Sequence, residues 1–228
     1  MACFITIEGI EGAGKSTLRA RLAELLKELQ KEVVLTREPG ATPLGQSVRT
    51  ILLDPTTKDI HPIAELMLFS ADRAQHVSQV LKPALDRGAI VVCDRYIHST
   101  LAYQGYGRGI DLRSLKLMND LTTEGLLPDV VLLLDLDPEK GLERALERTR
   151  RATMTINTSE FGGRDKDPES WTRFEQQAIE FHSRVRDGFL TLAKQDPERF
   201  LLLDAEQDPD KVAALAFAAI KKKISAHV

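Results

Sequence analysis

A glycine-rich stretch at residues 9–16, GIEGAGKS, constrains the fold of this chain more than any other feature. A short apolar run at residues 3–7 precedes it, and a helical pattern with Leu18, Leu22 and Leu29 on one face follows it. A strand that turns through glycines into a helix presents backbone N–H groups and the positive end of the helix dipole to phosphate oxygens. A glycine-rich turn with an accidental Lys-Ser pair is the alternative, but the strand and helix around the stretch favour a nucleoside triphosphate site.

We expect ATP to bind along this loop and the first turn of the helix. Lys15 would reach the β- and γ-phosphates, and the hydroxyl of Ser16 would hold Mg²⁺. The pattern does not indicate what is done with the triphosphate. The expected ATP-binding residues are Gly9, Ile10, Glu11, Gly12, Ala13, Gly14, Lys15, Ser16 and Thr17.

Short apolar runs alternate with longer helical patterns along the chain. The expected strands lie at residues 3–7, 33–36, 90–93, 130–134 and 200–203, and the main helices at 18–29, 44–52, 63–85, 112–124, 139–149, 174–192 and 212–224. Runs without polar alternation are typical of parallel strands that helices cover on both faces. The chain is therefore predicted to be an α/β protein with a parallel sheet, and residues 150–172, which lack periodicity, to be an insert between helices.

Polar residues follow the expected strands directly. Arg37 comes after the second strand, and Asp94 and Arg95 come after the third. Parallel strands end at one edge of the sheet, where ligands bind in open α/β folds. Asp94 could therefore support the metal ion, with helix or turn capping as the alternative. The two arginines and Lys15 exceed the charge that one triphosphate needs, which indicates a second anion, with surface ion pairing as the alternative.

Composition excludes several classes of protein. The 228 residues include 31 Lys and Arg against 34 Asp and Glu, and this net charge of −3 argues against a nucleic-acid partner. No apolar run approaches the roughly 20 residues of a membrane span. Two cysteines cannot build a disulfide framework or a four-thiolate zinc site. We expect one cytoplasmic domain that covers residues 1–228.

The chain resembles the thymidylate kinases of the bacterial type. The motifs that carry the resemblance are FITIEG at 4–9, TREPG at 36–40, DRY at 94–96 and STLAYQG at 99–105, and GRG at 107–109 and PD at 128–129 also fit. The resemblance covers nearly the whole chain. It implies a three-layer P-loop kinase fold with a five-stranded parallel sheet, a lid segment and a homodimer. It also implies Mg²⁺-dependent transfer of the γ-phosphate of ATP to dTMP, giving dTDP and ADP in dTTP biosynthesis.

The resemblance also implies an acceptor site for the thymine base and its sugar. Phe69 would stack on the thymine, and Arg73, four residues later on the same helix face, would hydrogen-bond it. Thr100 and Gln104 fall where the family reads the edge of the base. Tyr103 falls where a ring crowds the sugar 2′ position and disfavours ribonucleotides.

The remaining implied residues act on the phosphates. Glu11 matches an acidic position near the acceptor sugar and the metal ion, and Arg95, assisted by Arg37, would hold the dTMP phosphate. An anionic phosphate oxygen needs no strong general base, so catalysis depends on aligning two polyanions and neutralising charge, with Lys15 and Arg95 as catalytic cations.

The loop itself holds no arginine, so we expect a further cation from a lid at residues 148–173. Arg173 resembles the lid arginine of the family, and Arg148 and Arg164 are the substitutes. Two other functions stay open: a related P-loop kinase for another pyrimidine monophosphate or a deoxynucleoside, and a switch that binds ATP without efficient transfer.

Overall fold

The computed structural model describes residues 2–57, 59–156, 173–175 and 177–225, with the backbone alone at 149 and 151–156. Its centre is a five-stranded parallel sheet of order β2-β3-β1-β4-β5. The strands are β1 (Cys3–Glu8), β2 (Val33–Arg37), β3 (Ile90–Asp94), β4 (Val130–Asp135) and β5 (Phe200–Asp204). All five predicted strands are confirmed. Each continues one residue beyond its apolar run, because the ladder also pairs a polar residue at the carboxyl end, as between Asp135 and Asp204.

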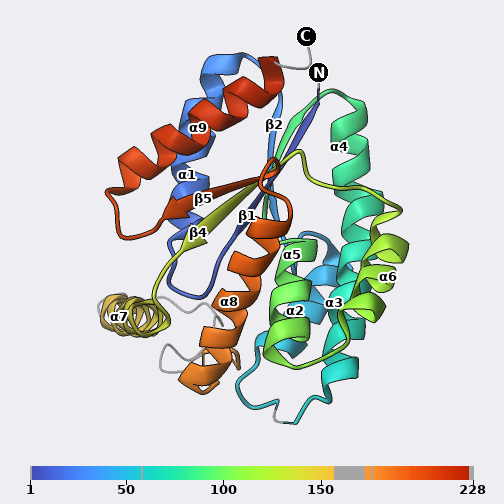
Figure 1. Cartoon of the computed structure of the whole chain (residues 1–228), viewed down its shortest axis with the longest axis vertical. Helices are drawn as coiled ribbons and strands as arrows, with labels where there is room; N and C mark the ends of the chain where they lie inside the picture. The colour runs from blue at the N-terminus through green and yellow to red at the C-terminus, as the bar shows by residue number, and fades with distance from the viewer. Residues whose placement is uncertain (1, 58, 157–172, 176, 226–228) are drawn as a thin grey trace.

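Helices cover both faces of this sheet, as the apolar strands predict. On one face α1 (Lys15–Leu26) and α9 (Pro209–Ser225) lie side by side, and Figure 1 shows them together on one side of the strands. The remaining helices are α2 (Pro43–Leu53), α3 (Pro62–His76), α4 (Lys82–Asp86), α5 (Ile97–Thr100), α6 (Leu112–Thr123), α7 (Pro138–Ile156) and α8 (Ile179–Gln195). No helix in the described part of the chain is both long enough and apolar enough to span a bilayer.

Three helical predictions differ from the structure. The pattern at 63–85 forms three consecutive pieces, α3, a π-helical segment η2 (Val77–Leu81) and α4. The predicted helix at 174–192 begins only at Ile179, because contacts with other elements hold residues 173–175 in a turn. In the other direction, α7 runs on to Ile156, into the stretch that lacks apolar periodicity. The rest of that stretch, residues 157–172, lies outside the described residues.

Two short elements complete the helices. A 3₁₀ turn, η1 (Lys27–Leu29), forms the end of the helix predicted at 18–29, and a π-helical segment with no predicted helical pattern, η3 (Leu101–Gly107), follows α5. π-helical segments are frequent at functional sites, because the wider turn shifts the directions of neighbouring side chains. Segment η3 contains Tyr103 and Gln104, two of the predicted acceptor residues.

The glycine-rich loop between β1 and α1 packs closely on the start of α7. Gly12 has φ of 72°, and a Cβ added there would lie 2.0 Å from the carbonyl oxygen of Gly141. A Cβ on Gly141 would in turn lie 2.6 Å from the carbonyl oxygen of Glu11. Both glycines therefore permit a backbone contact that any side chain would prevent, and this contact places α7 beside the loop.

Gly141→Ala tests this contact. Alanine favours a helix over glycine by roughly 1 kcal/mol, but the clash with backbone should cost about 1–3 kcal/mol, so a net loss of stability is expected. Thermal unfolding should show a lower midpoint for Gly141→Ala and little change for Glu143→Ala, an exposed position of the same helix. An unchanged or higher midpoint for Gly141→Ala would mean that the contact is loose.

Candidate active site

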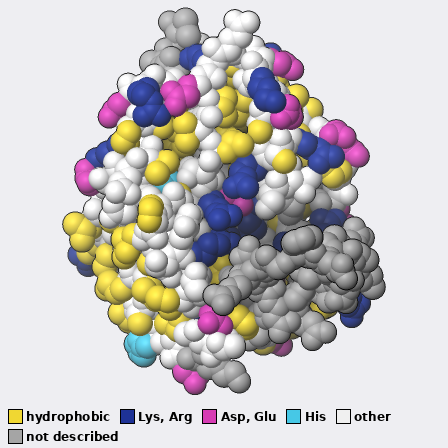
Figure 2. Space-filling view, turned by 180° about the vertical axis from the view of Figure 1, so that it is seen from behind, with side chains coloured by type: hydrophobic (Ala, Val, Ile, Leu, Met, Phe, Trp, Pro, Cys, Tyr) yellow, Lys and Arg dark blue, Asp and Glu magenta, His cyan; other side chains and the backbone are white. Residues whose placement is uncertain are grey.

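A cavity of about 380 Å³ lies at the carboxyl edge of the sheet, beside the glycine-rich loop. Its walls come from the loop, the segment after β2, α2, α3, the segment 95–104, α7 and residues 174 and 175. Figure 2 shows Lys and Arg side chains gathered near the middle of one face. Among the residues predicted for the site, those that line the cavity are Glu11, Gly12, Gly14, Lys15, Ser16, Thr17, Phe69, Arg73, Arg95, Thr100, Tyr103 and Gln104.

Lys15 is buried and folds back onto the loop that carries it. Its Nζ donates to the carbonyl oxygens of Gly9 at 3.0 Å and Ile10 at 2.6 Å. Burial, and then the charge of Arg95, lower the pKa of Lys15 to about 8, against the opposing effect of nearby carboxylates. The two carbonyl groups of the loop therefore fix the position of the Lys15 ammonium group. Its lowered pKa means that the group can lose its charge at mildly alkaline pH.

Arg95 joins the end of β3 to the same loop. It has φ of 69°, and its guanidinium donates to the carbonyl oxygen of Gly9 at 3.1 Å and to Oε1 of Glu11 at 3.0 Å. The hydroxyl of Tyr103 donates to both oxygens of Glu11, at 2.7 and 2.8 Å. Three predicted residues, Glu11, Arg95 and Tyr103, therefore meet in one hydrogen-bonded group.

His182 is a member of this group that sequence reasoning missed. Its Nδ1 lies 3.4 Å from Oε2 of Glu11, and its side chain is 1% exposed. Burial alone would raise the pKa of Glu11, but the hydrogen bond from His182 and the charges of Arg95 and Lys15 outweigh it and lower that pKa. Glu11 is thus held as a carboxylate. In the sequence His182 is one of five histidines with no ligand spacing, so no signal pointed to it.

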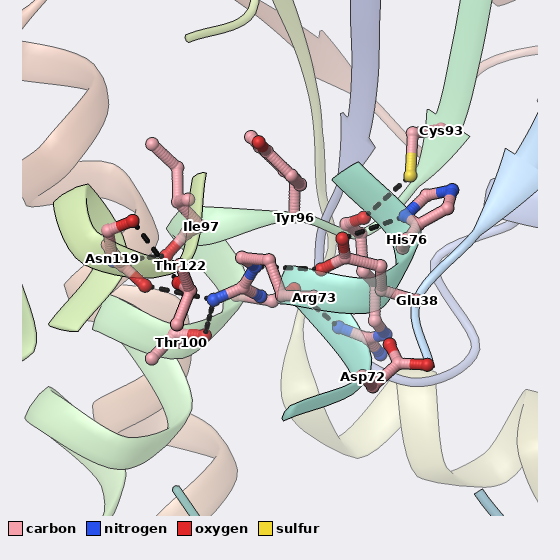
Figure 3. A network of polar contacts seen from close by, with 12 residues as sticks. Glu38, Asp72, Arg73, His76, Cys93, Tyr96, Ile97, Thr100, Asn119 and Thr122 are labelled. Atoms are coloured by element: carbon pink, nitrogen blue, oxygen red, sulfur yellow. Dashed lines mark hydrogen bonds and ion pairs between the residues drawn. The ribbon is translucent and has the colours of Figure 1, made fainter. Parts of the chain in front are cut away.

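Arg73 lies at the centre of a buried network, which Figure 3 shows from close by. Its Nε donates to Oε2 of Glu38 at 2.9 Å, and one terminal nitrogen donates to Thr100 at 2.8 Å and to Asn119 at 2.9 Å. Nδ1 of His76 lies 2.9 Å from the second oxygen of Glu38. Glu38 belongs to the TREPG motif and could have been found there, whereas His76 and Asn119 carried no signal.

One face of α3 lies toward the cavity. Glu65, Phe69 and Arg73 follow one another at intervals of four residues, which places them on the same side of the helix. The ring of Phe69 lies 6.1 Å from the ring of Phe174, and both line the cavity. Phe174 was expected inside a helix and instead lies in a turn, where it lines the cavity beside Phe69.

Ser16 and Asp94, the predicted metal ligands, fit Mg²⁺ by their chemistry. Ser16 is exposed at the start of α1, and Oδ1 of Asp94 is buried without a hydrogen-bond partner in the described part of the chain. A hydroxyl and a carboxylate oxygen suit Mg²⁺, which keeps several waters and also binds substrate phosphates. No group of three or more His, Cys, Asp or Glu suited to a metal occurs among the described residues, so protein ligands would be few.

Arg37, predicted to assist Arg95, is not brought into the cavity. It is exposed at the end of β2, because alternate residues of an edge strand point to opposite sides. Arg49 of α2 lines the cavity instead, with a terminal nitrogen 3.0 Å from the carbonyl oxygen of Pro39. Of these two arginines, Arg49 is the one that lines the cavity, and the sequence predicted it only as part of an ordinary helix.

Arg173, the expected lid arginine, also lies outside the cavity lining. It is 7% exposed, its Nε donates to the carbonyl oxygen of Leu52 at 3.2 Å, and its guanidinium pairs with Glu65. A buried carboxylate therefore holds this arginine outside the cavity lining. Arg148, one of the two substitutes, does line the cavity and pairs with Glu175 at 2.8 Å. The other substitute, Arg164, and most of the predicted lid lie outside the described residues.

Comparison with known proteins agrees with this geometry. The thymidylate kinase family model matches residues 7–215. A thymidylate kinase of Nitratidesulfovibrio vulgaris is 46% identical over 98% of both chains, and one of Desulfovibrio desulfuricans is 48% identical over 96% of this chain and 94% of its own. The crystal structure of thymidylate kinase from Ehrlichia chaffeensis superposes with a TM-score of 0.72 at 33% identity, over 96% of this chain and 98% of that one. The chain belongs to the thymidylate kinase family.

Proposed function

We propose that this chain transfers the γ-phosphate of ATP to dTMP and releases dTDP and ADP, as a step of dTTP biosynthesis. The observation that carries the proposal is a second binding region directly beside the glycine-rich loop. Phe69 supplies an aromatic surface, and Arg73 and Gln104 supply fixed polar groups, all lining one cavity with Lys15 and Arg95. The relatives named thymidylate kinase, which align over nearly the whole chain, give independent support.

The two alternative functions account for less of this site. A switch that only binds ATP needs the loop and a metal ion, but it has no use for a buried network that holds Arg73 at a second region of the cavity. A kinase for another pyrimidine monophosphate would use the same phosphate contacts and differ only at the base. The base-facing residues therefore decide between acceptors.

The mechanism follows from the charge on both substrates. The attacking oxygen of a phosphate monoester is already anionic, so the protein must align two polyanions and neutralise the transferred group. Lys15 lies in the loop, Arg95 bridges the loop to the acceptor side, and Arg148 of α7 faces the same cavity. Mg²⁺, held by Ser16 and Asp94, would supply further positive charge to the phosphates. Arg148 takes the place that the sequence had given to Arg173.

Three further features are part of the proposal. The chain acts as one kinase domain over residues 1–228, with residues 148–173 as its lid. It works in the cytoplasm. It forms a homodimer through the faces of α2, α3 and α6, which carry the exposed side chains of Leu44, Ile51, Met67, Leu117 and Leu121. Figure 2 shows hydrophobic side chains gathered on the side of the molecule where these helices lie.

A panel of acceptors tests the proposed reaction. ADP release should be followed with dTMP, dUMP, dCMP and thymidine at saturating ATP and Mg²⁺. We expect dTMP to give the highest kcat/KM, because Phe69, Arg73 and Gln104 would contact its base and Arg95 its phosphate. Thymidine, which lacks the phosphate, should be a poor acceptor. If dTMP released no more ADP than water does, the kinase assignment would be wrong.

Arg95→Ala tests the assignment of that arginine to the transferred and accepted phosphates. We expect kcat/KM for dTMP to fall by roughly 100-fold or more, since a charge that meets the developing transition state is lost. ATP affinity, measured by calorimetry, should change much less. Arg87→Ala removes an exposed arginine paired with Glu32 and should leave both values unchanged. An equal loss of ATP affinity in Arg95→Ala would place Arg95 on the donor instead.

The lowered pKa of Lys15 predicts a pH dependence of ATP binding. Burial and Arg95 lower that pKa to about 8, so the free protein loses the ammonium charge as the pH rises above this value. ATP affinity should therefore weaken above pH 8, by up to about tenfold per pH unit. Lys15→Arg, which stays charged, should remove this dependence. A dissociation constant that is constant from pH 7 to 9.5 would show that Lys15 remains charged throughout.

A further inference from the structure

Glu65 is a buried carboxylate directly behind the acceptor side of the cavity. Its side chain is fully buried on α3, and it is not itself a lining residue. Its Oε1 accepts a hydrogen bond from Nε2 of Gln104 at 2.9 Å. It also pairs with the guanidinium groups of Arg108, at 3.2 Å, and Arg173. A single carboxylate thus holds one residue of the cavity wall and two cations that lie behind that wall.

The charge of this cluster determines which end of the Gln104 amide lies toward Glu65. Gln104 and two guanidinium groups all donate to the two oxygens of Glu65, which therefore acts as an acceptor in every one of these contacts. Only the NH₂ group of Gln104 can satisfy it, because the amide oxygen would face another acceptor. The amide of Gln104 is thus fixed with its nitrogen toward Glu65.

The carbonyl oxygen of Gln104 is left for the cavity. Gln104 is 1% exposed and lines the cavity, and within the described part of the chain nothing donates to its Oε1. Its backbone is also fixed, because it lies in η3 and its carbonyl oxygen accepts from the amide of Ile110 at 3.0 Å. The side chain consequently presents an acceptor in one orientation to whatever occupies the cavity.

We propose that Glu65 is a positioning residue that sets the base preference of the acceptor site. By fixing the amide of Gln104, it makes the site favour a pyrimidine with a hydrogen on ring N3, as in thymine and uracil, over one with a lone pair there, as in cytosine. This inference rests on the proposed function, since it takes Gln104 to face the acceptor base. It assigns to Glu65 a role in selecting the substrate rather than in the transfer itself.

The two bases differ in the atom that each would place against Oε1 of Gln104. A thymine N3–H donates to the oxygen of Gln104, whereas the N3 lone pair of cytosine opposes that oxygen and leaves both acceptors unsatisfied. An unsatisfied buried polar group at this position should lower kcat/KM by roughly 5- to 150-fold. Arg73 can also favour thymine, because its guanidinium only donates. Loss of the Glu65 contact should therefore remove part of the preference and leave the rest.

Glu65→Gln is the direct test. An amide at position 65 can donate as well as accept, so the amide of Gln104 becomes free to turn over. We expect the ratio of kcat/KM for dTMP to kcat/KM for dCMP to fall at least about tenfold, while KM for ATP stays unchanged. Arg173→Met is the matched control. It removes a cation from the same carboxylate but leaves the contact with Gln104, so this ratio should stay within about twofold of the wild type.

Each outcome bears on the proposal. If kcat/KM falls equally for dTMP and dCMP in Glu65→Gln, Glu65 only supports the structure and the proposal is wrong. If that variant fails to fold in thermal unfolding, Gln104→Leu tests the premise without disturbing the arginine pairs of Glu65. An unchanged dTMP to dCMP ratio in Gln104→Leu would overturn the proposal. Failure of the proposed function is distinct, because the wild type would then show no activity with dTMP.

Discussion

The active-site edge of this protein depends on the contact between Arg95 and the glycine-rich loop. Arg95 has a left-handed backbone at φ of 69°, which costs a residue with a side chain about 1–2 kcal/mol. The surrounding contacts offset this cost, because its guanidinium reaches the carbonyl oxygen of Gly9 and the carboxylate of Glu11. The end of β3 is thereby tied to the loop after β1. Donor and acceptor phosphates would meet at this junction.

Buried and partly buried carboxylates hold the arginines of the site before any substrate binds. Glu11 pairs with Arg95, Glu38 with Arg73, and Glu65 with both Arg108 and Arg173. An unpaired buried charge would be costly, and a paired guanidinium has fewer conformations to lose when a ligand arrives. The carboxylates also separate two kinds of arginine. Those beside Glu11 and Glu38 still line the cavity, whereas those beside Glu65 lie behind its wall.

The sequence predicted the sheet well because buried parallel strands are continuous apolar runs. Each of the five strands ends within one residue of its predicted end. It was weaker where tertiary contacts override local pattern. Phe174 continues an apolar stripe, yet it lies in a turn because the neighbouring Arg173 is held by Glu65. The choice between Arg37 and Arg49, and between Arg173 and Arg148, depends on side-chain direction, which spacing does not determine. The motifs point to this edge of the sheet, and the fold determines which arginines line the cavity there.

A crystal structure with dTMP bound would test most directly whether this cavity is the acceptor site. We expect the thymine ring to lie against Phe69, with its N3 within hydrogen-bond distance of Oε1 of Gln104. The phosphate of dTMP should lie at Arg95. Nε2 of Gln104 should still contact Glu65 in that complex. A dTMP molecule bound outside this cavity, or a Gln104 amide turned with its nitrogen toward the base, would contradict the account.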